Sequence, residues 1–302
     1  MGSIGYTAQP STNGGLTFVS TVHHDTYPTI DASKVDMVGR HVFITGASRG
    51  IGQALAVAYA VAGASIIGIA ARSDLSSVKE EVEAAALATG RKLPKVITVP
   101  LDISDKANIE EALHDLGPAF DFKLDVLVNN AGRMETWKPL GETDFDDWWS
   151  SWEVNVRGTS LVTRALLPLL LAAGSLKTVV NVSSIGALMT SAGGSAYQCN
   201  KFAVLRLTEF LNVEYGDSQG LLAFSMHPGM VETPLSLNLP KFLHSKLKDT
   251  PELMANTTVY LTHQRQEWLA GRYISCNWDM EEFLSRKEEI VSLDKLKMKL
   301  MV

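Results

Sequence analysis

Short apolar segments alternate with amphipathic segments along most of this 302-residue chain. Seven segments rich in β-branched residues predict strands, at 41–45, 65–70, 95–101, 125–129, 178–183, 221–227 and 272–277. The stretches between them predict helices at 51–61, 77–89, 106–116, 145–171, 196–215 and 251–264. Alternation of this kind is typical of a parallel sheet with helices on both faces. We therefore expect an α/β fold, with a doubly wound sheet of about seven parallel strands in a single domain.

Both ends of the chain depart from this alternation. Residues 1–38 mix Gly, Ser, Thr and Pro and lack the apolar core of a secretory signal, so we interpret them as an arm before a domain at 39–302. Residues 279–302 form a charged C-terminal tail. The uncharged stretch 54–71 has the length of a membrane span. Its internal Gly63 and Gly68 favour a helix, a turn and a strand instead.

Composition narrows the choice of partner and compartment. The chain is 46% hydrophobic and 20% charged, and its net charge of -6 comes without a concentrated Lys/Arg block. We therefore expect no nucleic-acid or membrane partner, and a small-molecule substrate instead. The two cysteines, Cys199 and Cys276, lack CxxC spacing, which argues against a disulfide framework or a Cys-rich zinc site. A reducing, cytoplasmic location and a protein without a metal fit this pattern.

A glycine-rich turn follows the first expected strand. It reads Gly46-Ala47-Ser48-Arg49-Gly50-Ile51-Gly52, and an apolar helix comes next. Glycines let the backbone turn tightly and approach a pyrophosphate, while free N–H groups at the helix start bind anions. This motif predicts a dinucleotide site on a Rossmann-type fold. A plain strand-to-helix turn without a ligand is the alternative.

The end of the second strand bears on which dinucleotide is bound. Folds of this kind that prefer NAD usually carry an Asp or Glu there to bind the ribose 2′-OH. This chain has Arg72 instead, and Arg72 and Arg49 are suited to pair with a 2′-phosphate. We therefore expect NADP(H). The alternative is that both arginines are solvated surface charges.

Tyr197 and Lys201 lie four residues apart, so on a helix their side chains share one face. A free phenol has a pKa near ~10, and a nearby ammonium lowers it. The pair predicts acid/base chemistry with Tyr197 as the proton donor, although a structural pair is the commoner explanation of this spacing alone. Cys199 lies about 200° round the helix from Tyr197, so we expect it to point away into the core.

The remaining motifs make the chain resemble the short-chain dehydrogenase/reductase family from about residue 39 to residue 235. They follow the glycine turn in the family's order: Leu101-Asp102-Ile103, Asn129-Asn130-Ala131-Gly132, Val154-Asn155-Val156, Asn181-Val182-Ser183-Ser184 and His227-Pro228-Gly229-Met230-Val231-Glu232-Thr233. As a set these motifs are highly specific for the family.

The resemblance implies a catalytic set of Asn155, Ser184, Tyr197 and Lys201. Ser184 would hydrogen-bond the substrate oxygen and Tyr197 would transfer the proton while the nicotinamide transfers the hydride. Lys201 would lower the pKa of Tyr197 and bind the nicotinamide ribose, and Asn155 would hold a water for proton return. Ser184 is preferred to Ser183 because it lies thirteen residues before Tyr197, the family's usual spacing.

The predicted cofactor-binding residues come from the same motifs. They are Gly46, Ser48, Arg49, Gly50, Ile51, Gly52, Arg72, Asp102, Asn130, Ala131, Gly132, Arg164, Tyr197, Lys201, Val231 and Thr233. Arg164 is included because it follows Asn155 on one expected helix, and a helix-surface role is its alternative. The resemblance further implies a substrate lid near 234–250 and a homo-oligomer, either a dimer or a tetramer.

The substrate is indicated only by a weaker resemblance. The polar arm, the tryptophans Trp148, Trp149 and Trp152, and the Lys/Glu-rich tail are similar to fungal members that serve secondary metabolism. We expect a reductase that interconverts a ketone and a secondary alcohol on an apolar polyketide or terpenoid intermediate. Two alternatives stay open: an isomerase or cyclase on the same fold, and a nucleotide sensor without catalysis.

Overall fold

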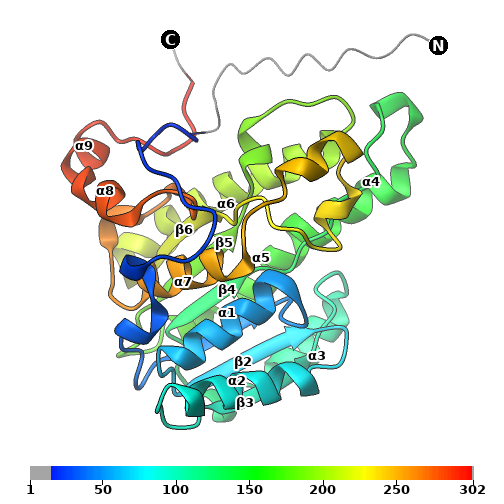
Figure 1. Cartoon of the computed structure of the whole chain (residues 1–302). Coiled ribbons are helices and arrows are strands. Elements are labelled where there is room, and N and C mark those ends of the chain that lie inside the picture. Colours follow the sequence, from blue (N-terminus) through cyan, green and yellow to red (C-terminus); the bar gives the residue numbers. More distant parts are fainter. Residues whose placement is uncertain (1–14, 301–302) are drawn as a thin grey trace.

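The computed structural model describes residues 15–300 and contains a seven-stranded, wholly parallel sheet between two layers of helices (Figure 1). The strand order is β3-β2-β1-β4-β5-β6-β7. The strands are β1 (His41–Thr45), β2 (Ile66–Ala71), β3 (Lys95–Pro100), β4 (Val126–Asn129), β5 (Thr178–Val182), β6 (Leu222–His227) and β7 (Tyr273–Ser275). The expected doubly wound α/β fold is confirmed. Only β7 differs from its expected bounds by more than one residue.

Helices cover both faces of the sheet. One layer holds α1 (Gly50–Val61), α2 (Ser76–Ala88) and α7 (Pro251–Thr262), and the other holds α3 (Lys106–His114), α5 (Thr159–Leu170) and α6 (Ser195–Gln219). The stretch 54–71 divides into the end of α1, a turn and β2. Within residues 15–300, no helix combines the length and the apolar character that a membrane crossing requires.

The helix expected at 145–171 contains a local irregularity. It consists of α4 (Phe145–Trp152), a π-helical segment at Glu153–Gly158, and α5. π-Helical turns are uncommon and often mark functional positions, and this one carries Asn155.

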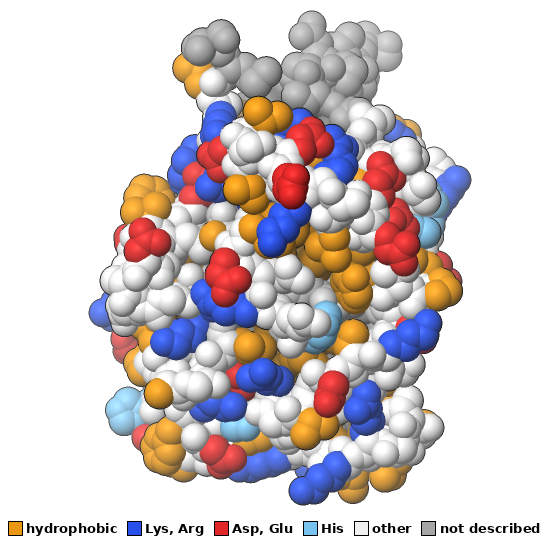
Figure 2. Space-filling model, turned by 90° about the vertical axis from the view of Figure 1, so that its left-hand side faces the viewer, with side chains coloured by type: hydrophobic (Ala, Val, Ile, Leu, Met, Phe, Trp, Pro, Cys, Tyr) orange, Lys and Arg blue, Asp and Glu red, His pale blue; other side chains and the backbone are white. Residues whose placement is uncertain are grey.

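The core on either side of the sheet follows from the apolar strands. In β1, Val42 and Ile44 pack into the core under α1, while Phe43 packs into the opposite core under α3 and α5. All three side chains are fully buried, as expected for a central parallel strand. On the outside, basic and acidic side chains are interspersed over the face shown in Figure 2.

The two ends of the described chain pack together beside α7 (Figure 1). The arm forms an antiparallel bridge between Val22 and Trp278, and Trp278 is fully buried. The tail that follows forms α8 (Met280–Ser285) and α9 (Lys287–Ser292), which bury Phe283 and Ile290. The charged tail therefore contributes apolar side chains to the core.

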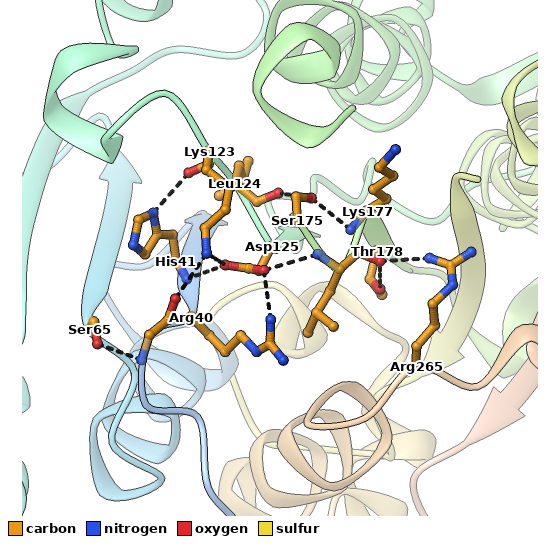
Figure 3. Close-up of polar contacts among 12 residues, drawn as sticks. Arg40, His41, Ser65, Lys123, Leu124, Asp125, Ser175, Lys177, Thr178 and Arg265 are labelled. Carbon is orange, nitrogen blue, oxygen red and sulfur yellow. Dashed lines mark hydrogen bonds and ion pairs between the residues drawn. The ribbon is translucent and has the colours of Figure 1, made fainter. Parts of the chain in front are cut away.

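A buried carboxylate joins three strands at the amino end of the sheet (Figure 3). Asp125, directly before β4, accepts hydrogen bonds from the backbone N–H groups of His41 (2.9 Å) and Leu176 (3.0 Å). Its oxygens also pair with Arg40 at 3.3 Å and Lys123 at 3.2 Å. Since the carboxylate is fully buried, these partners replace the water that it loses on folding.

Substituting Asp125→Ala should therefore lower the free energy of unfolding by about 3–5 kcal/mol, because buried N–H groups and two cations lose their partner. Urea denaturation of the purified protein measures this loss. Asp115→Ala, which removes an exposed carboxylate, is the matched control and should change stability by less than about 0.5 kcal/mol. Equal effects of the two substitutions would contradict the assigned role of Asp125.

Candidate active site

A cavity of about 550 Å³ lies at the carboxyl ends of the central strands. In this strand order, β1 and β4 are neighbours whose connections run to opposite sides, which is where open α/β sheets bind ligands. The predicted site residues that line it are Gly46, Ser48, Arg49, Gly50, Ile51, Gly52, Arg72, Asp102, Asn130, Ala131, Gly132, Tyr197, Lys201 and Thr233. The sheet topology thus brings together residues from most of the chain.

The glycine turn comes very close to the loop after β4. A Cβ added at Gly52 would lie 2.2 Å from the Gly46 carbonyl oxygen, and one at Gly46 would lie 2.8 Å from Ala131 Cα. The Asn130 side chain fixes this approach, because its Nδ2 donates to the carbonyl oxygens of Thr45 (2.9 Å) and Gly46 (3.1 Å). Side chains are thus excluded where the backbone must approach a ligand.

This arrangement fits a dinucleotide. Helix α1 begins at Gly50 on the cavity wall, so its first N–H groups and the positive end of its dipole are available to a pyrophosphate. Thr45 Oγ1 accepts from the N–H groups of Asn130 and Ala131, both at 3.1 Å, which holds the opposite wall in place. The residues present could therefore hold a nicotinamide dinucleotide.

The two arginines at the cavity have different surroundings. Arg72 is 3.6 Å from Asp102, and the Arg72 side chain is 73% exposed. Burial opposes ionisation of Asp102, but hydrogen bonds from Ser104 and the charge of Arg72 outweigh it and lower the pKa of that carboxyl. Arg49 is exposed and forms no ion pair with any residue that the structure describes. Its guanidinium is therefore available to an anionic ligand.

Ser184 lies next to Tyr197, which lines the cavity. The Ser184 hydroxyl accepts from the Gly186 N–H at 3.0 Å and lies close enough to the Tyr197 phenol to lower the pKa of that group. The neighbouring Ser183 instead donates its hydroxyl to the Lys201 carbonyl at 3.0 Å. This geometry favours Ser184 as the substrate-binding serine. Of the two, however, only Ser183 belongs to the cavity lining, so the role of Ser184 stays a prediction.

Burial controls the ionisation of the Tyr/Lys pair. It raises the pKa of Tyr197 to about 12, an effect that the nearby Ser184 hydroxyl reduces and the charge of Glu135 increases. It also lowers the pKa of Lys201 to about 8. Lys201 Nζ donates to the Val182 carbonyl at 2.8 Å and lies 5.7 Å from the centroid of the Tyr197 ring. The expected lowering of the phenol pKa by Lys201 is therefore not found, because desolvation of the phenolate dominates.

A ladder of buried polar side chains holds helix α6, which carries Tyr197 and Lys201, against the sheet. Asn129 Nδ2 donates to Asn181 Oδ1 at 2.8 Å, and Asn181 Nδ2 donates to Thr208 Oγ1 at 2.9 Å. Thr208 belongs to α6 and also contacts the Ser225 hydroxyl at 2.7 Å. The ladder crosses β4, β5 and β6, so it fixes α6 relative to three strands.

Asn155 braces the loop after β4 against α6. Its Nδ2 donates to the Arg133 carbonyl (2.7 Å) and to Asn200 Oδ1 (2.9 Å), and its Oδ1 accepts from the Arg133 N–H at 2.9 Å. Both N–H groups of the amide are thus bound by the chain itself. Its expected role in holding a water stays a prediction.

The sequence motifs gave no indication that Glu135 belongs to the site. This residue is buried against the first turn of α6. Its Oε1 accepts from the Tyr197 N–H at 3.0 Å, while Oε2 has no hydrogen-bond partner among the described residues. Burial raises the pKa of this carboxyl. Glu135 therefore holds the backbone of Tyr197. A charged residue in a loop is normally interpreted as solvated, so this role could not be predicted.

Three predicted positions differ from the expectation. Arg164 is exposed on α5 and outside the cavity lining, because the neighbouring Val162 and Thr163 form the buried face of that helix. Val231 is buried behind the lining, with its carbonyl accepting from Ser236 Oγ at 2.7 Å. Cys199 does point away from the site, but it is exposed and not in the core. The face of α6 that lies opposite Tyr197 is therefore exposed to solvent at Cys199.

Comparison with known proteins identifies the family. Residues 40–243 match the short chain dehydrogenase family. The chain is 52% identical over 290 residues to "Short chain dehydrogenase mpl6" of Monascus purpureus and, equally, to "Short chain dehydrogenase citE" of Monascus ruber. Each alignment covers 96% of this chain and 98% of the relative.

Two solved structures are similar to this one and contain nicotinamide cofactors. A short chain dehydrogenase from Shigella flexneri complexed with NADP is 26% identical, with a TM-score of 0.69 over 80% of this chain and 99% of that chain. The 3-ketoacyl-(acyl-carrier-protein) reductase from Brucella melitensis complexed with NADH is also 26% identical, with a TM-score of 0.67 over 80% and 97%. The resemblance drawn from the motifs is confirmed: this chain belongs to the short-chain dehydrogenase/reductase family of oxidoreductases, and its relatives include fungal members.

Proposed function

We propose that this protein is an NADP(H)-dependent reductase that interconverts a ketone and a secondary alcohol, with Tyr197 as proton donor. The observation that carries the proposal is the position of the Ser184 hydroxyl next to the buried Tyr197 phenol, which itself lines the glycine-rich cavity. Two hydroxyl groups at one place can bind the same carbonyl oxygen, and one of them can protonate it.

The protonation state of Tyr197 suits the reduction of a ketone. Because burial raises the pKa of Tyr197 to about 12, the phenol carries its proton at neutral pH and can give it to a developing alkoxide. Ser184 orients the carbonyl oxygen, and Lys201 supplies an ammonium that can bind a ribose hydroxyl. The nicotinamide cofactor, when bound, supplies the hydride. Asn155 and Glu135 hold the loop after β4 and the backbone of Tyr197 in position.

NADP(H) is proposed over NAD(H) because two arginines line the cavity: Arg49 in the glycine turn and Arg72 directly after β2. The substrate proposed is an apolar natural-product intermediate of fungal secondary metabolism, a polyketide or terpenoid. The fungal relatives support it, as do the apolar Met134 and Leu235 in the cavity lining. The free cysteines, one exposed and one buried, are in keeping with a reducing, cytoplasmic location.

A homo-oligomer, a dimer or a tetramer, is also proposed. Helix α6 exposes Phe202, Phe210 and Val213, which lie close together round the helix. Apolar side chains gathered on one helix face are typical of a protein interface.

Replacing Tyr197→Phe should lower the rate of ketone reduction by at least about 10²-fold, because the proton donor is lost. NADPH binding, followed by fluorescence titration, should change little, since the ring still fills its place. Tyr215→Phe, further along the same helix, is the matched control and should keep full activity. A Tyr197→Phe protein that turns over normally would refute the mechanism.

Arg49→Ala and Arg72→Ala should each raise the KM for NADPH by about tenfold, because a charge-assisted hydrogen bond to the 2′-phosphate is lost. The KM for NADH should stay the same. Arg164→Ala removes an exposed arginine outside the cavity lining and serves as the control. If both arginine substitutions weaken NADH as much as NADPH, the proposed cofactor preference is wrong.

Activity should also depend on pH through Lys201. Its pKa is lowered to about 8, so the ammonium is present below that pH and is lost as the pH rises through it, whereas Tyr197 stays protonated. We expect kcat/KM for reduction to be constant below about pH 8 and to fall by about tenfold per pH unit above it. A profile that stays flat to about pH 10 would contradict this assignment.

A further inference from the structure

We propose that the N-terminal arm is part of the active-site machinery: His24 positions Asp249, and Asp249 holds the loop at 228–233 against the cofactor cavity. The inference rests on the proposed function, because the loop matters through the nucleotide that it would contact. It makes His24 a positioning residue, about 200 residues before the loop in sequence.

Asp249 is bound tightly to the loop. It is 8% exposed, and its Oδ2 accepts from the Met230 N–H at 2.5 Å while its own N–H donates to the Met230 carbonyl at 3.1 Å. A parallel bridge pairs Asp249 with Val231. A Cβ added at Gly229 would lie 2.7 Å from Asp249 Oδ2, so the carboxylate lies directly against the turn.

The arm holds the other side of Asp249. His24 Nδ1 lies 2.5 Å from Asp249 Oδ1, which leaves the carboxylate between the ring and the loop. The next residue, Thr250, is held as well: its N–H donates to the His24 carbonyl at 2.9 Å and its hydroxyl donates to Asp25 Oδ1 at 2.8 Å. Two consecutive arm residues thus fix the end of the segment predicted as the lid.

The loop carries this constraint to the cavity. Ser236 Oγ donates to the Val231 carbonyl at 2.7 Å and accepts from the Thr233 N–H at 2.8 Å, so the loop and the following turn form one hydrogen-bonded unit. The residues of this unit that line the cavity are Pro228, Thr233, Pro234, Leu235 and Asn238. Their backbone positions therefore depend on where Asp249 is held.

The neighbouring His23 attaches the arm without touching Asp249. Its Nε2 lies 2.9 Å from Asp279 Oδ2, and its ring stacks on Tyr27 at 3.6 Å between centroids. Its backbone pairs with Asn277 through bonds of 2.7 and 2.9 Å. His23 and His24 thus offer adjacent positions, one that braces the arm and one that contacts the loop-holding carboxylate.

The test compares His24→Ala and His24→Asn with His114→Ala, which removes an exposed histidine paired with Asp115 outside the arm, all in the full-length protein. His24→Ala should raise the Kd for NADPH, measured by fluorescence titration, and its KM by about tenfold, the loss expected when a hydrogen bond to a charged group is removed. kcat should change much less. His24→Asn, whose Nδ2 lies near the position of the histidine Nδ1, should restore most of the affinity. His114→Ala should stay within about twofold of the unsubstituted protein.

Hydrogen exchange supplies a readout that needs no nucleotide. In His24→Ala the amides of residues 228–238 should exchange faster, while those of the central strands should be unchanged. Because the His24 side chain is 63% exposed, its removal leaves the core intact. Unchanged exchange and affinity in His24→Ala, equal losses in His114→Ala, or no rescue by His24→Asn would each overturn the inference. Absence of NADPH and NADH binding in the unsubstituted protein would instead refute the proposed function.

Discussion

The site depends on how closely the chain at Gly52 approaches the carbonyl of Gly46. No side chain larger than hydrogen fits there, and the Asn130 amide, reaching over from the loop after β4, ties the turn to the neighbouring strand. Helix α1 consequently begins at the cavity wall with its N–H groups free, and the crevice between β1 and β4 stays open. The proposed nucleotide site thus depends on backbone packing before any charged side chain contributes to it.

The proposed proton transfer takes place at buried side chains, from which water is largely excluded. Tyr197 and Lys201 are both buried, and burial pushes each towards its neutral form, which raises the pKa of Tyr197 and lowers that of Lys201. Glu135, buried with one oxygen unpartnered, adds a further cost to a phenolate. Such a site retains a proton well. It is suited to giving that proton away only when a stronger base, an alkoxide, is formed beside it.

The fold could be predicted almost completely from the sequence, because seven short segments rich in β-branched residues alternate with helical segments, and the central ones are continuously apolar. The glycine turn and the order of the motifs also predicted where the cavity lies, because the topology of a parallel sheet brings the carboxyl ends of its strands together. The burial and orientation of individual side chains were harder to predict. The exposure of Cys199 and Arg164, the π-helical turn around Asn155 and the burial of Glu135 depend on how helices are rotated and packed, which a periodic pattern does not specify.

The docking of the arm on the last part of the chain constrains the order of events during synthesis. The arm leaves the ribosome before the sheet does, and its partners around Asn277 and Asp279 lie more than 250 residues later. At about 5–20 residues per second, the arm stays undocked for on the order of tens of seconds. The sheet can form strand by strand in that time, but the arm can dock only after residues 277 and 279 have been synthesised. A truncated or stalled product would thus retain the glycine turn while lacking the residues that complete the far wall of the cavity.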